Sequence, residues 1–196
     1  MKKQVFIIFI ALFCGVQHLA NAQQVTLTET ELEEFGERAA TKIADFMDYL
    51  PVIGNKQKPQ KTRLYYIEQT LELFIDKGKN ASMEVAHILK NDQYETKTFK
   101  MPEYLNSVMN LAYRQVKIEF AETFYVSNFY KVGTNKYTAT ATIFQKFTGY
   151  GADGAPKYED ITKKTIEIVV ELVEDMHGAR WVVLLNNISV AEVFKP

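Results

Sequence analysis

The second half of the chain alternates between apolar and polar side chains, and this alternation restricts the folds open to it. Within residues 161–175 the apolar side chains of one face fall at every second position: Ile166, Ile168, Val170 and Leu172. Successive side chains of a strand point to opposite faces, so this spacing predicts a strand with one buried face. Segments 115–126, 136–147 and 180–193 follow the same rule between glycine-containing turns. Together they predict an antiparallel meander.

The last of these segments, residues 180–193, differs from the others because it is apolar on both faces. Strict alternation sets two groups against each other: Trp181, Val183 and Leu185 on one face, and Val182, Leu184 and Ile188 on the other. A strand covered on both faces lies inside a sheet. We therefore predict that this segment is a central strand.

The first half of the chain carries helical patterns instead. Apolar residues spaced by three and four predict a helix over 31–50, beginning at a capping box of Thr30 and Glu33 and ending at Pro51. A second helix is predicted over 62–75, with Leu64, Ile67, Leu71 and Phe74 on its buried side and Gly78 beyond its end. Residues 82–100 predict two short strands, and a third helix is predicted from Pro102.

The N-terminus is typical of a secretory signal peptide. Lys2 and Lys3 precede an apolar run over 5–13, and the small residues Ala20 and Ala22 follow at the positions that a signal peptidase reads. We predict cleavage after Ala22, which removes the only cysteine, Cys14, and leaves a single α+β domain over 23–196. The protein is then expected in the periplasm or outside the cell, without a stable membrane anchor.

Composition excludes several classes of function. Lysine and arginine number 23 against 24 acidic residues, without long runs of one sign, so nothing in the charge pattern indicates the basic face that nucleic acid requires. Cleavage after Ala22 leaves no thiolate for catalysis or metal binding. Without a metal-binding motif, a nucleophile elbow or a phosphate-binding loop, the sequence predicts no metal and no cofactor. The partner is expected to be a small molecule or a protein, and a homodimer is possible.

The order of these elements resembles that of the nuclear transport factor 2-like superfamily, also called the cystatin-like cone. The resemblance is carried by the amphipathic helix over 31–50, the helix in MPEYLNSVMNLAY (101–113) and the closing strand ARWVVLLNNISV (179–190). It implies a curved antiparallel sheet wrapped around the helices, with an open end that can hold a ligand. It also implies that the chain is either an enzyme similar to ketosteroid isomerase or a small dehydratase, or a binding or assembly module.

Glu122 is the candidate general base of the sequence. In a regular strand it shares a face with the apolar residues Ile118, Phe120 and Phe124. A buried carboxylate raises its pKa or acquires a partner, and either outcome suits proton transfer. The alternative is that a bulge turns Glu122 to the surface or that it lies in water at the sheet edge.

Three further residues complete the set of candidates. His87 is a second candidate proton carrier, although a structural histidine is the preferred interpretation because no second histidine or carboxylate stands beside it in the sequence. Tyr113 and Tyr125 are the candidate ligand-binding residues, with core packing as the alternative. The charges of EDITKK (159–164) are interpreted as surface. The function expected first is a non-catalytic binding or interaction module, and the alternative is an isomerase-like or dehydratase-like enzyme with a pocket carboxylate as base.

Overall fold

A computed structural model describes residues 26–89, 93–121, 124–176 and 178–194. The predicted signal peptide, with Cys14, and the candidate base Glu122 lie outside the described residues. No helix of the described part is long and apolar enough to cross a membrane.

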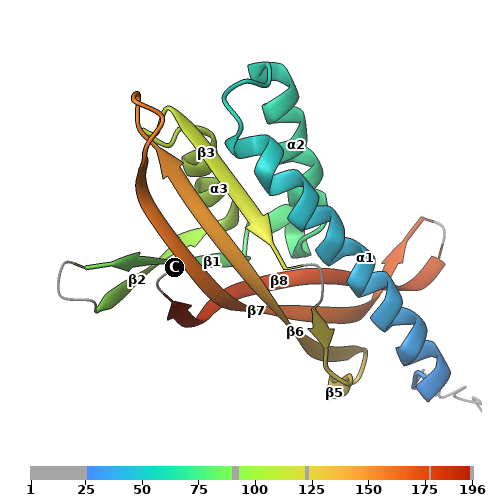
Figure 1. Ribbon diagram of the computed structural model, residues 1–196. Helices are drawn as coiled ribbons and strands as arrows, with labels where there is room; N and C mark the ends of the chain where they lie inside the picture. Colours follow the sequence, from blue (N-terminus) through green and yellow to red (C-terminus); the bar gives the residue numbers. More distant parts are fainter. Residues whose placement is uncertain (1–25, 90–92, 122–123, 177, 195–196) are drawn as a thin grey trace, which may run out of the picture.

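The fold is α+β, with helices packed on one strongly curved sheet of eight strands (Figure 1). The strands are β1 (Ser82–Ile88), β2 (Tyr94–Lys100), β3 (Gln115–Phe120), β4 (Tyr125–Val126), β5 (Tyr130–Gly133), β6 (Lys136–Tyr150), β7 (Pro156–Asp175) and β8 (Gly178–Phe194). The main path runs β2-β1-β8-β7-β6-β3, and the short β4 and β5 pair with β6. The predicted fold class and the meander of long strands are therefore confirmed.

The position of β8 inside the sheet confirms that it is a central strand. It pairs antiparallel with β7 and parallel with β1, where Met83 lies opposite Ile188. This parallel pairing makes the sheet mixed, whereas the meander predicted from sequence is antiparallel throughout.

The predicted facing of Ile188 on β8 is wrong, because a β-bulge interrupts the strand. Ile166 lies opposite Ile188 and Ile168 lies opposite Leu185, so two steps on β7 match three on β8. The extra residue shifts the alternation by one position. Ile188 is consequently buried on the same face as Leu185, not on the face of Leu184.

The helices are α1 (Glu29–Gly54), α2 (Gln60–Glu72), the 3₁₀ turn η1 (Ile75–Gly78) and α3 (Met101–Met109). Two predicted boundaries of α1 are wrong. Its capping box joins Thr28 to Glu31, two residues earlier than predicted, and Pro51 lies inside the helix. A proline removes one backbone donor, and the packing of the fully buried Leu50 and Ile53 holds the last turn together.

The buried side predicted for the second helix, α2, is confirmed in part: Ile67 and Phe74 are buried and Leu71 packs partly buried against the core, whereas the prediction for Leu64 is wrong. The buried side chains of α2 are Arg63, Ile67 and Thr70, while Leu64 is 41% exposed. The Arg63 guanidinium donates hydrogen bonds to the carbonyl oxygens of Ile53, in the last turn of α1, and Met109, in the last turn of α3. Since the last carbonyls of a helix have no partner within it, this arginine links the ends of two helices.

The predicted strand over 115–126 is divided in two. β3 ends at Phe120, and β4 contains only Tyr125 and Val126. Phe120 and Phe124 still pack against the core, so the apolar spacing identifies the inward direction of this segment correctly.

The hydrophobic core fills the part of the sheet's hollow that lies beside α1. Phe46 of α1 contacts Phe74 and Phe120 edge to face, at ring-centre distances of 5.8 and 6.4 Å. On the sheet the buried face is formed by Ala139, Ala141 and Ile143 of β6 and by Ile166, Ile168 and Val170 of β7. Beyond these residues, toward α3, the same face carries polar side chains on β7, and Gln145 followed by Phe147 on β6.

Candidate functional site

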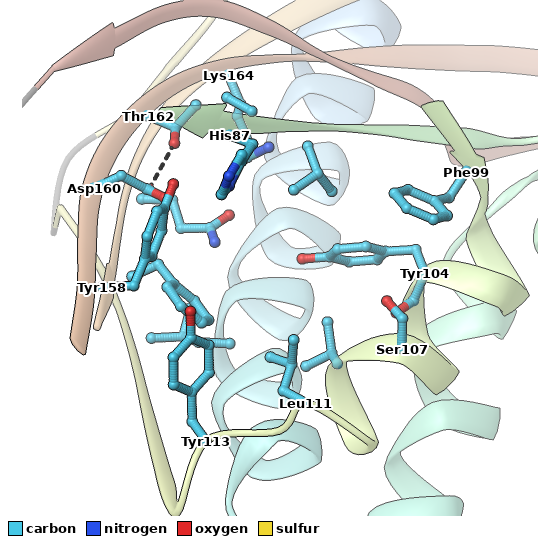
Figure 2. A pocket seen from close by; sticks show the side chains of 16 residues that line it. His87, Phe99, Tyr104, Ser107, Leu111, Tyr113, Tyr158, Asp160, Thr162 and Lys164 are labelled. Atoms are coloured by element: carbon cyan, nitrogen blue, oxygen red, sulfur yellow. Dashed lines mark hydrogen bonds between the residues drawn. The ribbon is translucent and has the colours of Figure 1, made fainter. Parts of the chain in front are cut away.

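A cavity of about 330 Å³ lies between α3 and the sheet. Its walls come from β1, β2, α3 with the loop that follows it, β3, β6 and β7. Most of the lining is apolar or aromatic, and one side of the pocket carries a group of polar residues: His87, Tyr158, Asp160, Thr162 and Lys164 (Figure 2). Ligand sites in proteins start at about 300 Å³ and combine an apolar wall with a few polar groups, so this cavity, called the cone pocket below, is large enough for a small organic molecule.

The polar groups of the cone pocket come mainly from one strand. Every second residue at the start of β7 points inward: Tyr158, Asp160, Thr162 and Lys164 all line the pocket. They continue the face that carries Ile166 and Ile168 in the core, because side chains of a strand alternate. One face of β7 therefore changes from apolar core to polar site along its length.

Asp160 is a buried carboxyl, only 6% exposed. The Thr162 hydroxyl donates a hydrogen bond to its Oδ1 at 3.0 Å, drawn as the dashed line in Figure 2. Burial raises the pKa of Asp160 above its ordinary value, while hydrogen bonds with Tyr158 and Thr162 and the charge of Lys164 act in the opposite direction. A carboxyl held in this way can exchange a proton closer to neutral pH than an exposed aspartate can.

Lys164 is buried more completely than Asp160, at 3% exposed. Its Nζ donates to the backbone oxygen of Glu84 at 2.7 Å and lies 3.8 Å from the sulfur of Met83. No described residue forms a salt bridge with it. Burial lowers the pKa of Lys164 to about 8, although the charges of Asp160 and Glu84 favour the protonated form.

Gln145 of β6 lies directly opposite Thr162 of the neighbouring strand β7, and it is 6% exposed. Its Oε1 is buried and has no hydrogen-bond partner among the described residues. The other buried side-chain polar atom of this kind, Nε1 of Trp181, lies outside the cone pocket. An unpaired buried acceptor costs about 1–3 kcal/mol, so a ligand or water that donates a hydrogen bond to Gln145 would remove this cost.

Three tyrosines bring phenolic hydroxyls to the pocket: Tyr104 of α3, Tyr113 of the following loop and Tyr158 of β7. Burial is the main cause of a raised pKa for all three, and the charge of Asp160 adds to it. Each stays protonated at neutral pH and can donate a hydrogen bond. Figure 2 shows the Tyr104 hydroxyl directed into the open space, opposite the group of Asp160 and Tyr158.

The structure brings together two of the residues predicted from sequence. His87 and Tyr113 both line the cone pocket. His87 is exposed at its rim, where its ring stacks on Tyr158 with a centre distance of 5.8 Å. Tyr125 does not line the pocket: it lies on the short strand β4 and is 69% exposed. Glu122 is outside the described residues, and the pocket carboxyl is Asp160.

Sequence reasoning missed Asp160, Lys164 and Gln145. The interpretation of EDITKK as surface is wrong for its buried members, because a run of charges read along the chain hides the alternation of a strand. Extending the spacing of Ile168 and Ile166 backwards reaches Lys164, Thr162 and Asp160 in turn. Gln145 carries the same signal, since it follows Ala141 and Ile143 at every second position of β6.

Comparisons with known proteins give distant likenesses. No family model and no curated protein matches the sequence. Among solved structures, the chain is similar to a provisionally assigned scytalone dehydratase from Novosphingobium aromaticivorans, at 10% identity and a TM-score of 0.46, over 84% of this chain and 90% of that one. It is also similar to a hexachlorocyclohexane dehydrochlorinase (LinA) of type 2, at 11% identity and a TM-score of 0.38, over 83% and 91% of the two chains.

A further similar structure is the Kfla4162 protein from Kribbella flavida, at 9% identity and a TM-score of 0.41, over 81% of this chain and 95% of that one. Likenesses of this size concern the path of the chain and carry no argument about activity. The order of the helices and strands agrees with the resemblance to the nuclear transport factor 2-like superfamily that the sequence predicts.

Proposed function

We propose that the protein binds one small organic molecule in the cone pocket. The observation that carries the proposal is the unpaired Oε1 of Gln145, buried in the wall of a cavity of about 330 Å³. The apolar lining suits a ring or a short hydrocarbon body, and Gln145 calls for a hydroxyl or N–H group on it. Tyr104 and Tyr113 can donate to an oxygen of the same molecule, whereas the Tyr158 hydroxyl already donates to Asp160.

A matched pair of probes tests this proposal. 2-Naphthol carries a hydroxyl that can donate a hydrogen bond, and 2-methoxynaphthalene has the same ring system without that donor. We expect 2-naphthol to bind more tightly to the wild-type protein by calorimetry. In Gln145→Met the preference for 2-naphthol should fall by roughly 5- to 10-fold, the value of one neutral hydrogen bond. Gln115→Met, at an exposed position of β3, is the control.

A second pair of variants shows where the probes bind. Leu111→Trp places a large ring in the pocket wall and should abolish binding. Leu64→Trp, on the exposed side of α2, should leave it unchanged. Equal binding to both variants, or no binding of either naphthalene to the wild-type protein, would contradict the proposal.

Acid–base catalysis is the second candidate function, and Asp160 is the observation that favours it. The proposed role is removal of a proton from carbon beside a carbonyl group, with a tyrosine hydroxyl donating to the oxyanion that forms. Exchange of the α-protons of 2-tetralone for deuterium, followed by NMR, tests this role without a known substrate. We expect faster exchange with the wild-type protein than with Asp160→Asn, and no effect of Asp153→Asn in an exposed loop. If all three proteins exchange the α-protons at equal rates, catalysis by Asp160 is contradicted and only the binding function stands.

We also propose that the chain is exported and works in the periplasm or outside the cell. This proposal is supported by the pattern of its first 22 residues.

A protein partner or a second copy of the chain is the alternative to a small molecule as the binding partner. The outer face of the sheet carries Phe144 and Phe194, with ring centres 6.5 Å apart, and the ion pairs Lys163–Glu192 and Lys146–Glu159.

A further inference from the structure

Lys164 differs from the other lysines of the described chain in being enclosed by the protein. It is 3% exposed and lines the cone pocket. The contacts of its Nζ are one backbone oxygen, of Glu84, and the sulfur of Met83. Each of the lysines that forms a salt bridge does so at the surface, as Lys163 does with Glu192.

A buried ammonium ion without a paired carboxylate is costly, and a lysine in this setting loses its proton readily. The hydrogen bond to Glu84 uses one of the amine's protons. In the neutral form the nitrogen also has a lone pair, and a desolvated neutral lysine is a nucleophile toward carbonyl groups. The cavity beside it has room for an organic molecule.

We propose that Lys164 forms a reversible imine with an aldehyde or ketone bound in the cone pocket. Nζ attacks the carbonyl carbon and gives a carbinolamine. Loss of water then forms the C=N bond, and the two protons of the neutral amine leave with the carbonyl oxygen. The step needs no oxidant and no further reactant, and water reverses it. This inference rests on the proposed binding function and names the class of ligand: a small, mainly apolar carbonyl compound.

The other groups of the pocket suit this reaction. On β7, the face of Lys164 also carries Thr162 and then Asp160, whose buried carboxyl can accept or supply a proton through a bound water or the ligand. His87 and Glu84 of β1 are the other ionisable groups near it, and Tyr104 is a neutral donor. With its pKa lowered to about 8 by burial, Lys164 has on the order of 200-fold more neutral amine at pH 7 than an ordinary lysine.

Borohydride trapping tests the proposal on the purified protein. 2-Naphthaldehyde is added at pH 7, sodium borohydride reduces any imine to a stable secondary amine, and peptide mapping by mass spectrometry locates the adduct. We expect one adduct, on Lys164, formed on the order of 100-fold faster than on surface lysines. Lys164→Met should lose this fast reaction, and Lys163→Met, the adjacent lysine on the outer face, should keep it.

Two further measurements keep the result interpretable. In the wild-type protein the rate of trapping at Lys164 should rise with pH to a plateau, with a midpoint near 8, whereas surface lysines continue to gain reactivity up to about 10.4. This profile needs no variant, so it stands even if Lys164→Met fails to fold. 2-Naphthalenemethanol, which has the same ring and no carbonyl, reports binding alone.

The outcomes separate the two proposals. If 2-naphthalenemethanol binds and 2-naphthaldehyde leaves no adduct on Lys164, the imine is overturned and small-molecule binding stands. Adducts spread evenly over surface lysines also overturn the imine, as does a preference of the wild-type protein for 2-naphthoate, which would indicate a charged Lys164. If neither naphthalene binds, the imine falls together with the binding function on which it rests.

Discussion

The burial of Lys164 makes the stability of the folded protein depend on pH. Its pKa falls from 10.5 to about 8 in the folded state, so the unfolded state binds more protons between these values. The free energy of unfolding therefore rises with pH over this range, and the contribution is lost as pH falls through about 8. We expect a rise of about 3 kcal/mol between pH 8 and 10.5 in urea denaturation.

This rise is measured against two variants. Lys164→Met should lack it, and Lys163→Met should show it in full, since Lys163 is paired with Glu192 at the surface. If the free energy of unfolding rises with pH equally in the wild-type protein and in Lys164→Met, the folded protein keeps Lys164 protonated over this range.

Gln145 gives a second prediction for a single side chain. Gln145→Met removes the unpaired Oε1 and keeps a side chain of similar length, so the ligand-free protein should become more stable by about 1–2 kcal/mol. Gln115→Met at the surface should change stability by less than about 0.5 kcal/mol. Thermal unfolding measures both. A loss of stability in Gln145→Met would show that water already satisfies the amide.

The link between helices through Arg63 is tested by removing its guanidinium. Arg63→Met leaves the carbonyl oxygens of Ile53 and Met109 without their buried donor, and we expect a loss of about 3 kcal/mol in chemical denaturation. Arg38→Met breaks a surface pair with Glu34 and should cost less than about 1 kcal/mol. If the two variants lose similar amounts of unfolding free energy, the hydrogen bonds of Arg63 do not hold α1 and α3 together.

The close approach of β6 to the pocket wall gives a second prediction for an element. A Cβ added to Gly149 would lie 2.6 Å from the ring of Tyr113, so Gly149→Ala must displace this ring. We expect a loss of about 1–3 kcal/mol in thermal unfolding, together with weaker binding of 2-naphthol. Gly36→Ala in α1 meets nothing within 4 Å and should stabilise the protein by about 1 kcal/mol. No displacement of Tyr113 in a crystal structure of Gly149→Ala would refute the argument.

At the scale of the whole molecule, export is the property to measure first. Expression of the full chain in a bacterium, followed by intact mass of the periplasmic fraction, should give residues 23–196. That product has no cysteine, so iodoacetamide should leave its mass unchanged. A retained N-terminus, or a product that reacts with iodoacetamide, would contradict cleavage after Ala22.

Much of the fold could be predicted from the sequence, because periodicity reports which face of an element is buried. The long strands, the central place of β8 and the amphipathic α1 all follow from spacing. Contacts between distant segments do not: the parallel pairing of Met83 with Ile188 and the bulge beside it depend on geometry that no local pattern encodes. The facing of Ile188 was predicted wrongly for this reason.

The candidate site was less predictable than the fold. The residue types of His87 and Tyr113 mark them as candidates, and the same criterion also selects Tyr125, which lies in solvent. Asp160 and Lys164 were hidden because charged side chains are normally at the surface, and an enclosed site departs from that rule. Alternation along β7 points to them once the length of the strand is known.

Strand β7 is divided into a core half and a pocket half, so the residues that stabilise the fold are separate from those that line the pocket. If the pocket binds a ligand as proposed, substitutions at Asp160, Thr162 and Lys164 should alter what it recognises, while Ile166, Ile168 and Val170 keep their burial. Related chains can therefore diverge in ligand while they inherit one scaffold, and a library randomised at the three polar positions is a direct route to new specificities.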